Sequence, residues 1–187
     1  MIKGDWVIKN EKQVYENNWI AIEHSEVITP GGSDGVYGVV RFKNLAVGIL
    51  PIDDDGFTWL VGQYRFPLEE YSWEIPEGGA PFDEDPTLGA RRELLEEVGV
   101  VCETLAPLLE LRTSNSVTDE KAIVYLAEGL SFEHRHPEDT ENLEVQKIHF
   151  SELFEKTMAG EILDAISVAA ILKLAHLRPS LCERPKN

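Results

Sequence analysis

The stretch that most constrains this chain is residues 78–100, which read G-G-A-P-F-D-E-D-P-T-L-G-A-R-R-E-L-L-E-E-V-G-V. The order of residue types predicts a glycine-led loop followed by a helix. Asp85 is a good N-cap because its carboxylate can accept backbone N–H groups of the first turn, and Pro86 suits the first helical position. Gly99 supplies the left-handed residue that commonly ends a helix. The pattern therefore predicts a helix over residues 86–98.

Three glutamates of this predicted helix, Glu93, Glu96 and Glu97, have the spacing i, i+3 and i+4. The helical repeat stacks them on one face, where like charges repel one another. A divalent cation would reverse the sign of that interaction, and Mg²⁺ typically takes one or two carboxylates together with water and substrate phosphates. A solvated acidic face is the alternative. The spacing of the glutamates alone does not separate the two interpretations.

The whole stretch is more specific than its glutamates, and it resembles the signature of the Nudix hydrolases, G-x5-E-x7-R-E-U-x-E-E-x-G-U, in which U is aliphatic. All nine specified positions match: Gly78, Glu84, Arg92, Glu93, Leu94, Glu96, Glu97, Gly99 and Val100. The resemblance implies Mg²⁺ as cofactor, with Mn²⁺ as a substitute. It also implies Glu93 and Glu97 as the chief metal ligands, Glu96 as a third and the backbone carbonyl of Glu77 as a fourth.

Two further segments resemble the ADP-ribose pyrophosphatase branch of this family. They are Gln63-Tyr-Arg65 with Trp73-Glu-Ile-Pro-Glu-Gly-Gly79, and Ala159-Gly-Glu-Ile followed by Asp164 and an apolar helix. The likeness covers residues 45–177. It implies hydrolysis of the pyrophosphate bond of a nucleoside diphosphate sugar such as ADP-ribose or GDP-mannose.

The same resemblance suggests residues that bind substrate. Arg65 suits a bidentate hold on a phosphate, although a sheet-edge arginine without a ligand is an equal alternative. Glu74 is a candidate for contact with the nucleoside or for packing. The aromatic residues near the N-terminus favour a core or an interface, and Trp19 among them is a candidate for stacking on the base.

The resemblance also assigns catalytic roles. Arg92 is expected to orient the carboxylates through an ion pair, so it is counted with Glu96 among the catalytic residues, and Glu84 is expected to be structural. In this branch the general base comes from the loop before the penultimate strand. Here that loop offers Asp139, Glu141 and Glu144, of which Glu141 fits the register best.

One segment departs from the branch and leaves the preferred sugar open. ADP-ribose enzymes usually carry a Ser-Pro-Gly type stretch about fifteen residues beyond the signature. This chain instead has Thr113-Ser-Asn-Ser-Val-Thr-Asp-Glu120, without proline or glycine.

The composition limits the partners and the compartment. Asp and Glu outnumber Lys and Arg by 34 to 17, which gives a net charge of −17, and no basic run is present. Long nucleic acids are therefore poor candidates as partners, because their phosphates are bound mainly by Lys and Arg. The two cysteines, Cys102 and Cys182, form no disulfide framework and favour a reducing cytoplasm. No apolar stretch is long enough to predict a membrane span.

The pattern of strands and helices predicts an α/β (α+β) fold, a Nudix α/β/α sandwich with a mixed sheet. Residues 1–44 are expected to form a small N-terminal antiparallel β-sheet, and residues 45–187 the catalytic domain. Further strands are predicted at 45–52, 57–65, 104–111, 121–127 and 143–150, with a loop over 128–142. A short helix capped by Ser151 and a last helix over 164–177 complete the chain. Because a sheet as small as the first one needs another apolar surface to cover, and because the branch exchanges such a sheet between subunits, a homodimer is expected.

These observations together predict a Mg²⁺-dependent hydrolase of nucleoside diphosphate sugars that forms a nucleoside monophosphate and a sugar phosphate. Within the family, the alternative is a pyrophosphohydrolase of nucleoside triphosphates or RNA ends. From a different class, the alternative is a non-catalytic nucleotide-sugar sensor.

Overall fold

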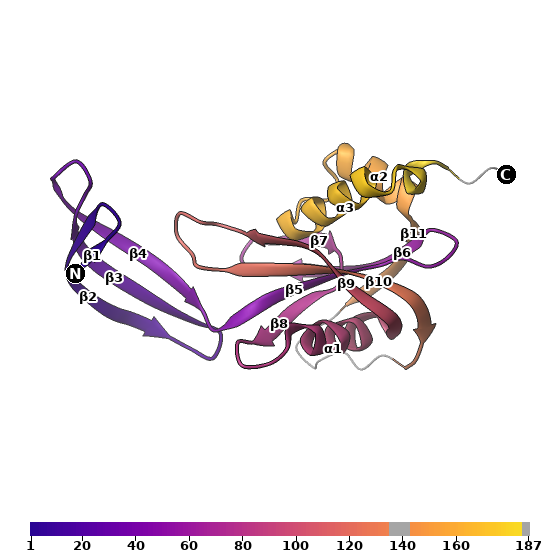
Figure 1. Cartoon of the computed structure of the whole chain (residues 1–187), viewed down its shortest axis with the longest axis horizontal. Helices are drawn as coiled ribbons and strands as arrows, with labels where there is room; N and C mark the ends of the chain where they lie inside the picture. Colours follow the sequence, from indigo (N-terminus) through magenta and orange to yellow (C-terminus); the bar gives the residue numbers. More distant parts are fainter. Residues whose placement is uncertain (135–142, 185–187) are drawn as a thin grey trace.

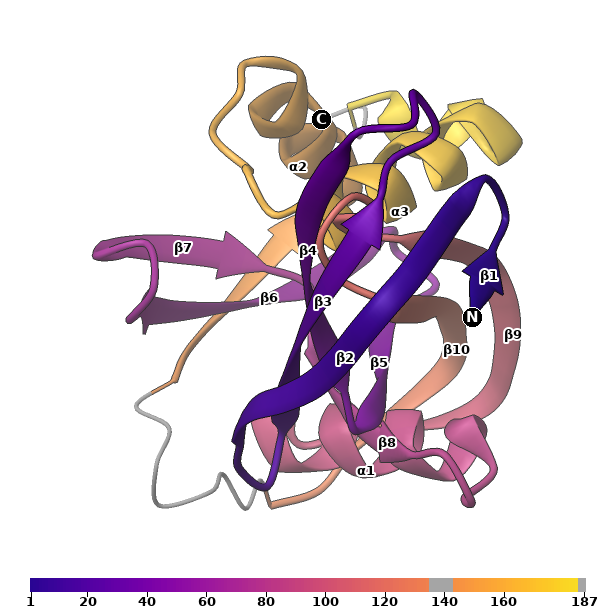
Figure 2. The same ribbon diagram turned by 90° about the vertical axis from the view of Figure 1, so that its left-hand side faces the viewer.

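The computed structural model describes residues 1–134 and 143–184. The first four strands form one antiparallel sheet in the order β1-β2-β3-β4. This N-terminal sheet projects from one end of the molecule (Figures 1 and 2). Its strands are β1 (Ile2–Lys3), β2 (Trp6–Glu16), β3 (Ile20–Ile28) and β4 (Asp34–Phe42).

The rest of the chain contains two further sheets. A mixed sheet has the order β8-β5-β10-β9, in which β5 and β10 are parallel and the other pairs are antiparallel. Its strands are β5 (Asn44–Pro51), β8 (Glu77–Pro81), β9 (Val100–Arg112) and β10 (Lys121–Phe132). An antiparallel sheet of order β11-β6-β7 is built from β6 (Phe57–Arg65), β7 (Glu70–Glu74) and β11 (Glu144–His149).

Helices cover both faces of the mixed sheet, with α1 on one side and α2 and α3 on the other (Figure 1). Their bounds are α1 (Pro86–Val98), α2 (Phe150–Met158) and α3 (Ala165–Leu177), followed by a 3₁₀ turn, η1 (Pro179–Cys182). Strand β5 shows why this arrangement is stable. Val47 and Ile49 belong to the core under α1, whereas Leu50 belongs to the core under α3. A strand buried on both faces is expected to be continuously apolar, as this one is.

The predicted limits of the signature helix are confirmed. The Asp85 side chain accepts the N–H of Thr87 at 3.0 Å, Pro86 is the first helical residue, and Gly99 ends the helix with φ of 69°. The fold class is also as predicted, since a mixed sheet lies between helices.

Several local predictions were wrong. Strand β9 begins at Val100, directly after Gly99, instead of at residue 104, because its first residues pair with the end of β10. The signature begins not in a loop but in strand β8, because its two glycines pair with β5. Strand β10 continues to Phe132 instead of ending at residue 127, because Gly129 takes φ of 66° and lets the strand stay paired with β9. The N-cap of α2 is His149, whose ring accepts the N–H of Ser151, so Ser151 is already helical.

The turn between β9 and β10 holds the N-terminal sheet in place. The N–H of Val40 donates to the carbonyl of Val117 at 2.9 Å, and the hydroxyl of Tyr37 donates to the carbonyl of Ser116 at 2.6 Å. The Asp119 carboxylate accepts the N–H of Phe42 at 2.9 Å. The segment that departs from the ADP-ribose pattern is therefore the segment that contacts β4.

Candidate active site

The first glycine of the signature, Gly78, lies directly against a carboxylate of α1. A Cβ atom added at Gly78 would lie 2.1 Å from Cδ of Glu93, much closer than real Cβ contacts. Glycine at this position therefore lets the Glu93 carboxylate approach the backbone of β8. The close approach explains why the signature pairs this glycine with this glutamate.

A second carboxylate of α1 reaches the same strand one residue earlier. Oε2 of Glu97 accepts the backbone N–H of Glu77 at 2.9 Å, and Glu97 is buried. Glu93 and Glu97 therefore both converge on the start of β8. Glu96 is half-buried on the same helix.

Arg92 ties the loop between β8 and α1 to the carboxylates. Its guanidinium donates to the carbonyl of Gly79 at 2.8 Å and lies 3.3 Å from Glu84 and 3.4 Å from Glu93. The ion pair expected of Arg92 is therefore made with Glu84 and Glu93. Because Glu84 lies in the loop between β8 and α1, its ion pair with Arg92 joins that loop to the helix.

The residues at the start of β8 suit a hard divalent cation. Within the described ranges, no group of three or more His, Cys, Asp or Glu side chains is arranged as a metal cage. Mg²⁺ does not need one, because it usually combines one or two carboxylates with water and substrate phosphates. The carboxylates of Glu93 and Glu97 beside β8, with Gly78 leaving room for Glu93, match that requirement.

Arg65 and Glu74 form an ion pair beside a cavity of about 420 Å³. Nε of Arg65 lies 3.0 and 3.1 Å from the two carboxylate oxygens of Glu74, which is buried, while the Arg65 side chain stays 38% exposed. The pair joins the ends of β6 and β7. The cavity is lined by Arg65, Pro67, Leu68, Glu70, Ser72, Glu74, Leu163, Asp164 and Ala165.

Asp164 in the lining of this cavity belongs to a cluster that sequence reasoning did not find. The side chains of Glu77 and Asp164 approach each other, and the Ser167 hydroxyl donates to Oε1 of Glu77 at 3.2 Å. Burial first, and then the charge and hydrogen bond of Asp164, raise the pKa of Glu77 well above its ordinary value. The available sequence signal was Asp164, three residues before Ser167, which is an N-cap pattern. The Asp164 carboxylate does accept the Ser167 N–H at 2.7 Å.

The other predicted residues lie elsewhere. Trp19 is in the turn between β2 and β3, 66% exposed, and is not among the residues that line the cavity beside Arg65. Asp139 and Glu141 fall outside the described residues. Glu144 begins β11 and is exposed, and its carboxylate accepts the hydroxyl of Tyr71, which helps to raise the pKa of that tyrosine after the larger effect of burial.

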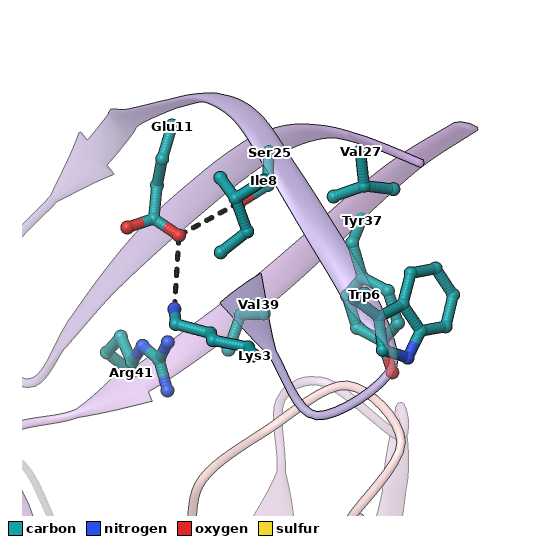
Figure 3. Close-up of a pocket in the computed structure, with 9 residues that line it drawn as sticks. All are labelled: Lys3, Trp6, Ile8, Glu11, Ser25, Val27, Tyr37, Val39 and Arg41. Carbon is teal, nitrogen blue, oxygen red and sulfur yellow. Dashed lines mark hydrogen bonds and ion pairs between the residues drawn. The ribbon is translucent and has the colours of Figure 1, made fainter. Parts of the chain in front are cut away.

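A second cavity, of about 190 Å³, lies on the N-terminal sheet (Figure 3). Trp6 and Tyr37 meet edge to face on one side of it, and Lys3 and Arg41 lie on the other. Glu11 accepts hydrogen bonds from Ser25 and Lys3 at its rim. None of the signature residues lines it.

Comparison with known proteins decides the family. The model of the NUDIX domain matches residues 42–167, which is more than half of the chain. This protein belongs to the Nudix hydrolase family. The matched range includes β8, α1 and the Arg65–Glu74 pair.

Two relatives narrow the branch, and a solved structure shares the fold. This Nudix hydrolase is 32% identical to an ADP-ribose pyrophosphatase of Mycobacterium tuberculosis, over 92% of this chain and 84% of that protein. It is 31% identical to an ADP-ribose pyrophosphatase of Bacillus subtilis, over 86% and 88% of the two chains. The crystal structure of an ADP compounds hydrolase shares the fold, with a TM-score of 0.80, 24% identity, and coverage of 94% and 95% of the two chains. The chain is therefore a Nudix hydrolase of the ADP-ribose pyrophosphatase type.

Among the helices of the described ranges, none has both the length and the apolar character that crossing a bilayer requires.

Proposed function

We propose that this Nudix hydrolase cleaves the pyrophosphate bond of nucleoside diphosphate sugars, in a Mg²⁺-dependent reaction, to a nucleoside monophosphate and a sugar phosphate. The observation that carries the proposal is the convergence of Glu93 and Glu97 on the start of β8. Two further observations support it. Asp164, which lines the cavity beside Arg65, interacts with the side chain of Glu77 at the start of β8, and the relatives that match most of the chain include two ADP-ribose pyrophosphatases.

In this proposal, the oxygen of water forms a bond to one phosphorus and the bridging oxygen leaves on the other phosphate. Glu93 and Glu97, with Glu96 and the carbonyl of Glu77, hold the cation. When bound, Mg²⁺ neutralises diphosphate oxygens and lowers the pKa of the attacking water. The base that accepts the proton from water is proposed to be Glu141, with Asp139 and Glu144 as the alternatives.

The chain's own residues position the substrate. The Arg65 guanidinium is fixed by Glu74 and keeps an exposed edge at the cavity, where it can donate to a phosphate. Glu74 then acts on substrate through Arg65. Arg92 keeps Glu93 in place and does not need to touch the substrate. Trp19 remains a candidate for stacking on the base only if its sheet meets a second subunit.

A homodimer is part of this proposal. Cross-strand pairing puts Val7 and Val36 on the same face of the N-terminal sheet as Ile22 and Tyr15. Val7, Tyr15 and Val36 are all exposed there. The same face also carries Lys12, His24 and Glu26, so its exposed apolar residues lie among polar ones. Exposed apolar residues on a small sheet are expected to be covered by another surface, and a second copy of the chain supplies one.

A substrate panel tests the function. The protein is incubated with Mg²⁺ and ADP-ribose, GDP-mannose, UDP-glucose or dGTP, and the products are separated by chromatography. We expect a nucleoside monophosphate and a sugar phosphate from at least one of the diphosphate sugars. Cleavage of dGTP alone would favour the alternative, which is supported by an RNA pyrophosphohydrolase of Caulobacter vibrioides that is 43% identical over 54 residues. Binding without any product would favour a sensor.

Two variants test the assigned residues in the same assay. Glu97→Gln should abolish most turnover, because a neutral amide is a poor ligand for a hard cation. Glu141→Gln should lower kcat about 100-fold or more while the protein still binds Mn²⁺. Hydrolysis at the wild-type rate by Glu97→Gln would contradict the metal site, and by Glu141→Gln would remove that residue as the base.

A further inference from the structure

The segment between the two sheets of the catalytic part is fixed by hydrogen bonds from several elements. This crossover segment, residues 75–77, leaves β7 in the antiparallel sheet and enters β8 in the mixed sheet. The carbonyl of Pro76 accepts the N–H of Ile49 at 2.8 Å, and the N–H of Glu77 donates to Oε2 of Glu97 at 2.9 Å. The last bond joins the segment to a proposed metal ligand.

Ser167 holds the same segment from the opposite side. Its hydroxyl accepts the N–H of Ile75 at 2.9 Å and donates to Oε1 of Glu77 at 3.2 Å. A hydroxyl has one donor and two acceptor sites, so both bonds form at once and use the only proton. The side chain is fully buried, and its own N–H is fixed by the Asp164 carboxylate at 2.7 Å. The hydroxyl is therefore held by α3 and holds both ends of the crossover segment.

We propose that Ser167 is a positioning residue that fixes the Glu97 carboxylate for metal binding, by clamping the crossover segment whose Glu77 N–H that carboxylate accepts. The inference rests on the proposed metal-dependent function. The chain of contacts runs from the N-terminus of α3, through Ser167 and Glu77, to the face of α1 that carries Glu97. Ser167 touches neither cation nor substrate in this proposal.

Ser167→Ala tests the proposal with two readouts. The first is Mn²⁺ binding to the protein without substrate, measured from the electron paramagnetic resonance signal of free Mn²⁺. The second is kcat and KM for the diphosphate sugar that the wild type cleaves best. We expect Mn²⁺ to bind about ten-fold more weakly and kcat to fall about ten-fold, as is typical for groups that orient metal ligands, while KM changes less than about three-fold.

Matched variants separate positioning from general loss of stability. Thr157→Val removes another buried hydroxyl, which donates to the carbonyl of Leu153 at 2.8 Å in α2, away from the crossover segment. We expect it to lower the melting temperature without changing Mn²⁺ binding. Ser167→Thr keeps the hydroxyl and should recover part of the Mn²⁺ affinity. Ser167→Cys fills the space of the hydroxyl with a slightly larger thiol but loses the strong donor, so the comparison stands even when Ser167→Ala does not fold.

The outcomes also distinguish this proposal from the function on which it rests. A wild-type protein that neither binds Mn²⁺ nor cleaves any diphosphate sugar would overturn both. A wild-type protein that does both, with a Ser167→Ala variant that matches Thr157→Val in Mn²⁺ affinity and kcat, would overturn the role of Ser167 alone.

Discussion

At the scale of single residues, the proposed metal site depends on close contacts between side chains and the backbone of β8. Gly78 is the sharpest example, because the atom that its missing side chain makes way for is the carboxylate carbon of Glu93. The glycine is needed for close approach rather than for a left-handed backbone, since Gly78 is not among the positive-φ glycines. Its replacement should therefore damage the chemistry more than the fold.

Gly78→Ala is expected to keep the fold and lose activity. The added Cβ would displace the Glu93 carboxylate, which lies at the end of a flexible side chain, so the backbone of β8 can stay in place. We expect kcat to fall about ten-fold or more, as for lost metal orientation, and the melting temperature to change little. Gly31→Ala, in the turn between β3 and β4, is the control, because a Cβ built there makes only an ordinary contact with Thr29 at 3.8 Å. Equal activity of the two variants would contradict the role of the close approach.

Thr58 carries a buried hydroxyl group that does not stabilise the fold. Thr58 is fully buried in β6, and among the described residues its hydroxyl has no hydrogen-bond partner. Thr58→Val replaces that hydroxyl by a methyl group of similar size and should raise the free energy of unfolding by about 1 kcal/mol. Urea unfolding monitored by tryptophan fluorescence measures the change. A loss of stability would show that the hydroxyl is satisfied, for example by an ordered water.

At the scale of elements, local signals predicted the signature helix well and failed where partners are distant in sequence. Asp85, Pro86 and Gly99 set the helix limits because each acts within one turn of its own position. Ser167 was not found, because its hydroxyl meets Ile75 and Glu77 across 92 and 90 positions of the chain. The resemblance implied that Glu93 and the carbonyl of Glu77 are metal ligands, but the contact of Glu93 with Gly78 was not predicted, since no periodicity relates a strand to the helix beside it.

The turn between β5 and β6 provides a test of charge at the element scale. Asp53 accepts the N–H groups of Asp55 and Phe57 at 3.1 and 2.8 Å, and a third bond from Lys147 at 2.9 Å. Burial alone would raise the pKa of Asp53, but these bonds, led by that of Lys147, hold it below its ordinary value of 3.8. A lowered pKa stabilises the fold above pH 3.8, and this contribution is lost as the pH falls through the folded-state pKa.

Asp53→Asn should therefore cost about 1 kcal/mol at pH 7, because the amide keeps one acceptor but loses the charge, and Lys147 is half exposed. The difference from wild type should shrink as the pH is lowered towards 3. Urea unfolding at the two pH values measures it, with the exposed Asp54→Asn as control. A difference that is the same at both pH values would show that the turn responds to shape and not to charge.

At the scale of the whole molecule, the N-terminal sheet has one face that no other part of the described chain covers. Its β4 edge rests on the turn between β9 and β10, while the face with Val7, Tyr15 and Val36 is open. The sequence predicted a small antiparallel sheet here, with aromatic residues in its core or at an interface. It did not predict the contact between the 113–120 turn and β4, because that contact depends on the lengths and relative positions of strands in two separate sheets.

Val36→Asp is expected to turn a dimer into a monomer. The Val36 side chain is 68% exposed in the single chain, and the wild type should sediment as a dimer. A carboxylate at this position would be buried without a partner on association. Leu177→Asp is the control, because that side chain is also exposed but ends α3, a helix that does not belong to the N-terminal sheet. A wild-type monomer at micromolar concentration would contradict the dimer.

The contact between the 113–120 turn and β4 has a consequence for how such enzymes can diversify. Asp119 and Val117 form hydrogen bonds with β4, the edge strand of the N-terminal sheet. An insertion or deletion in the turn between β9 and β10 would therefore change the orientation of that whole sheet. A chimera that takes its β9–β10 hairpin from a relative should therefore also take the relative's strand equivalent to β4, because the two segments contact each other.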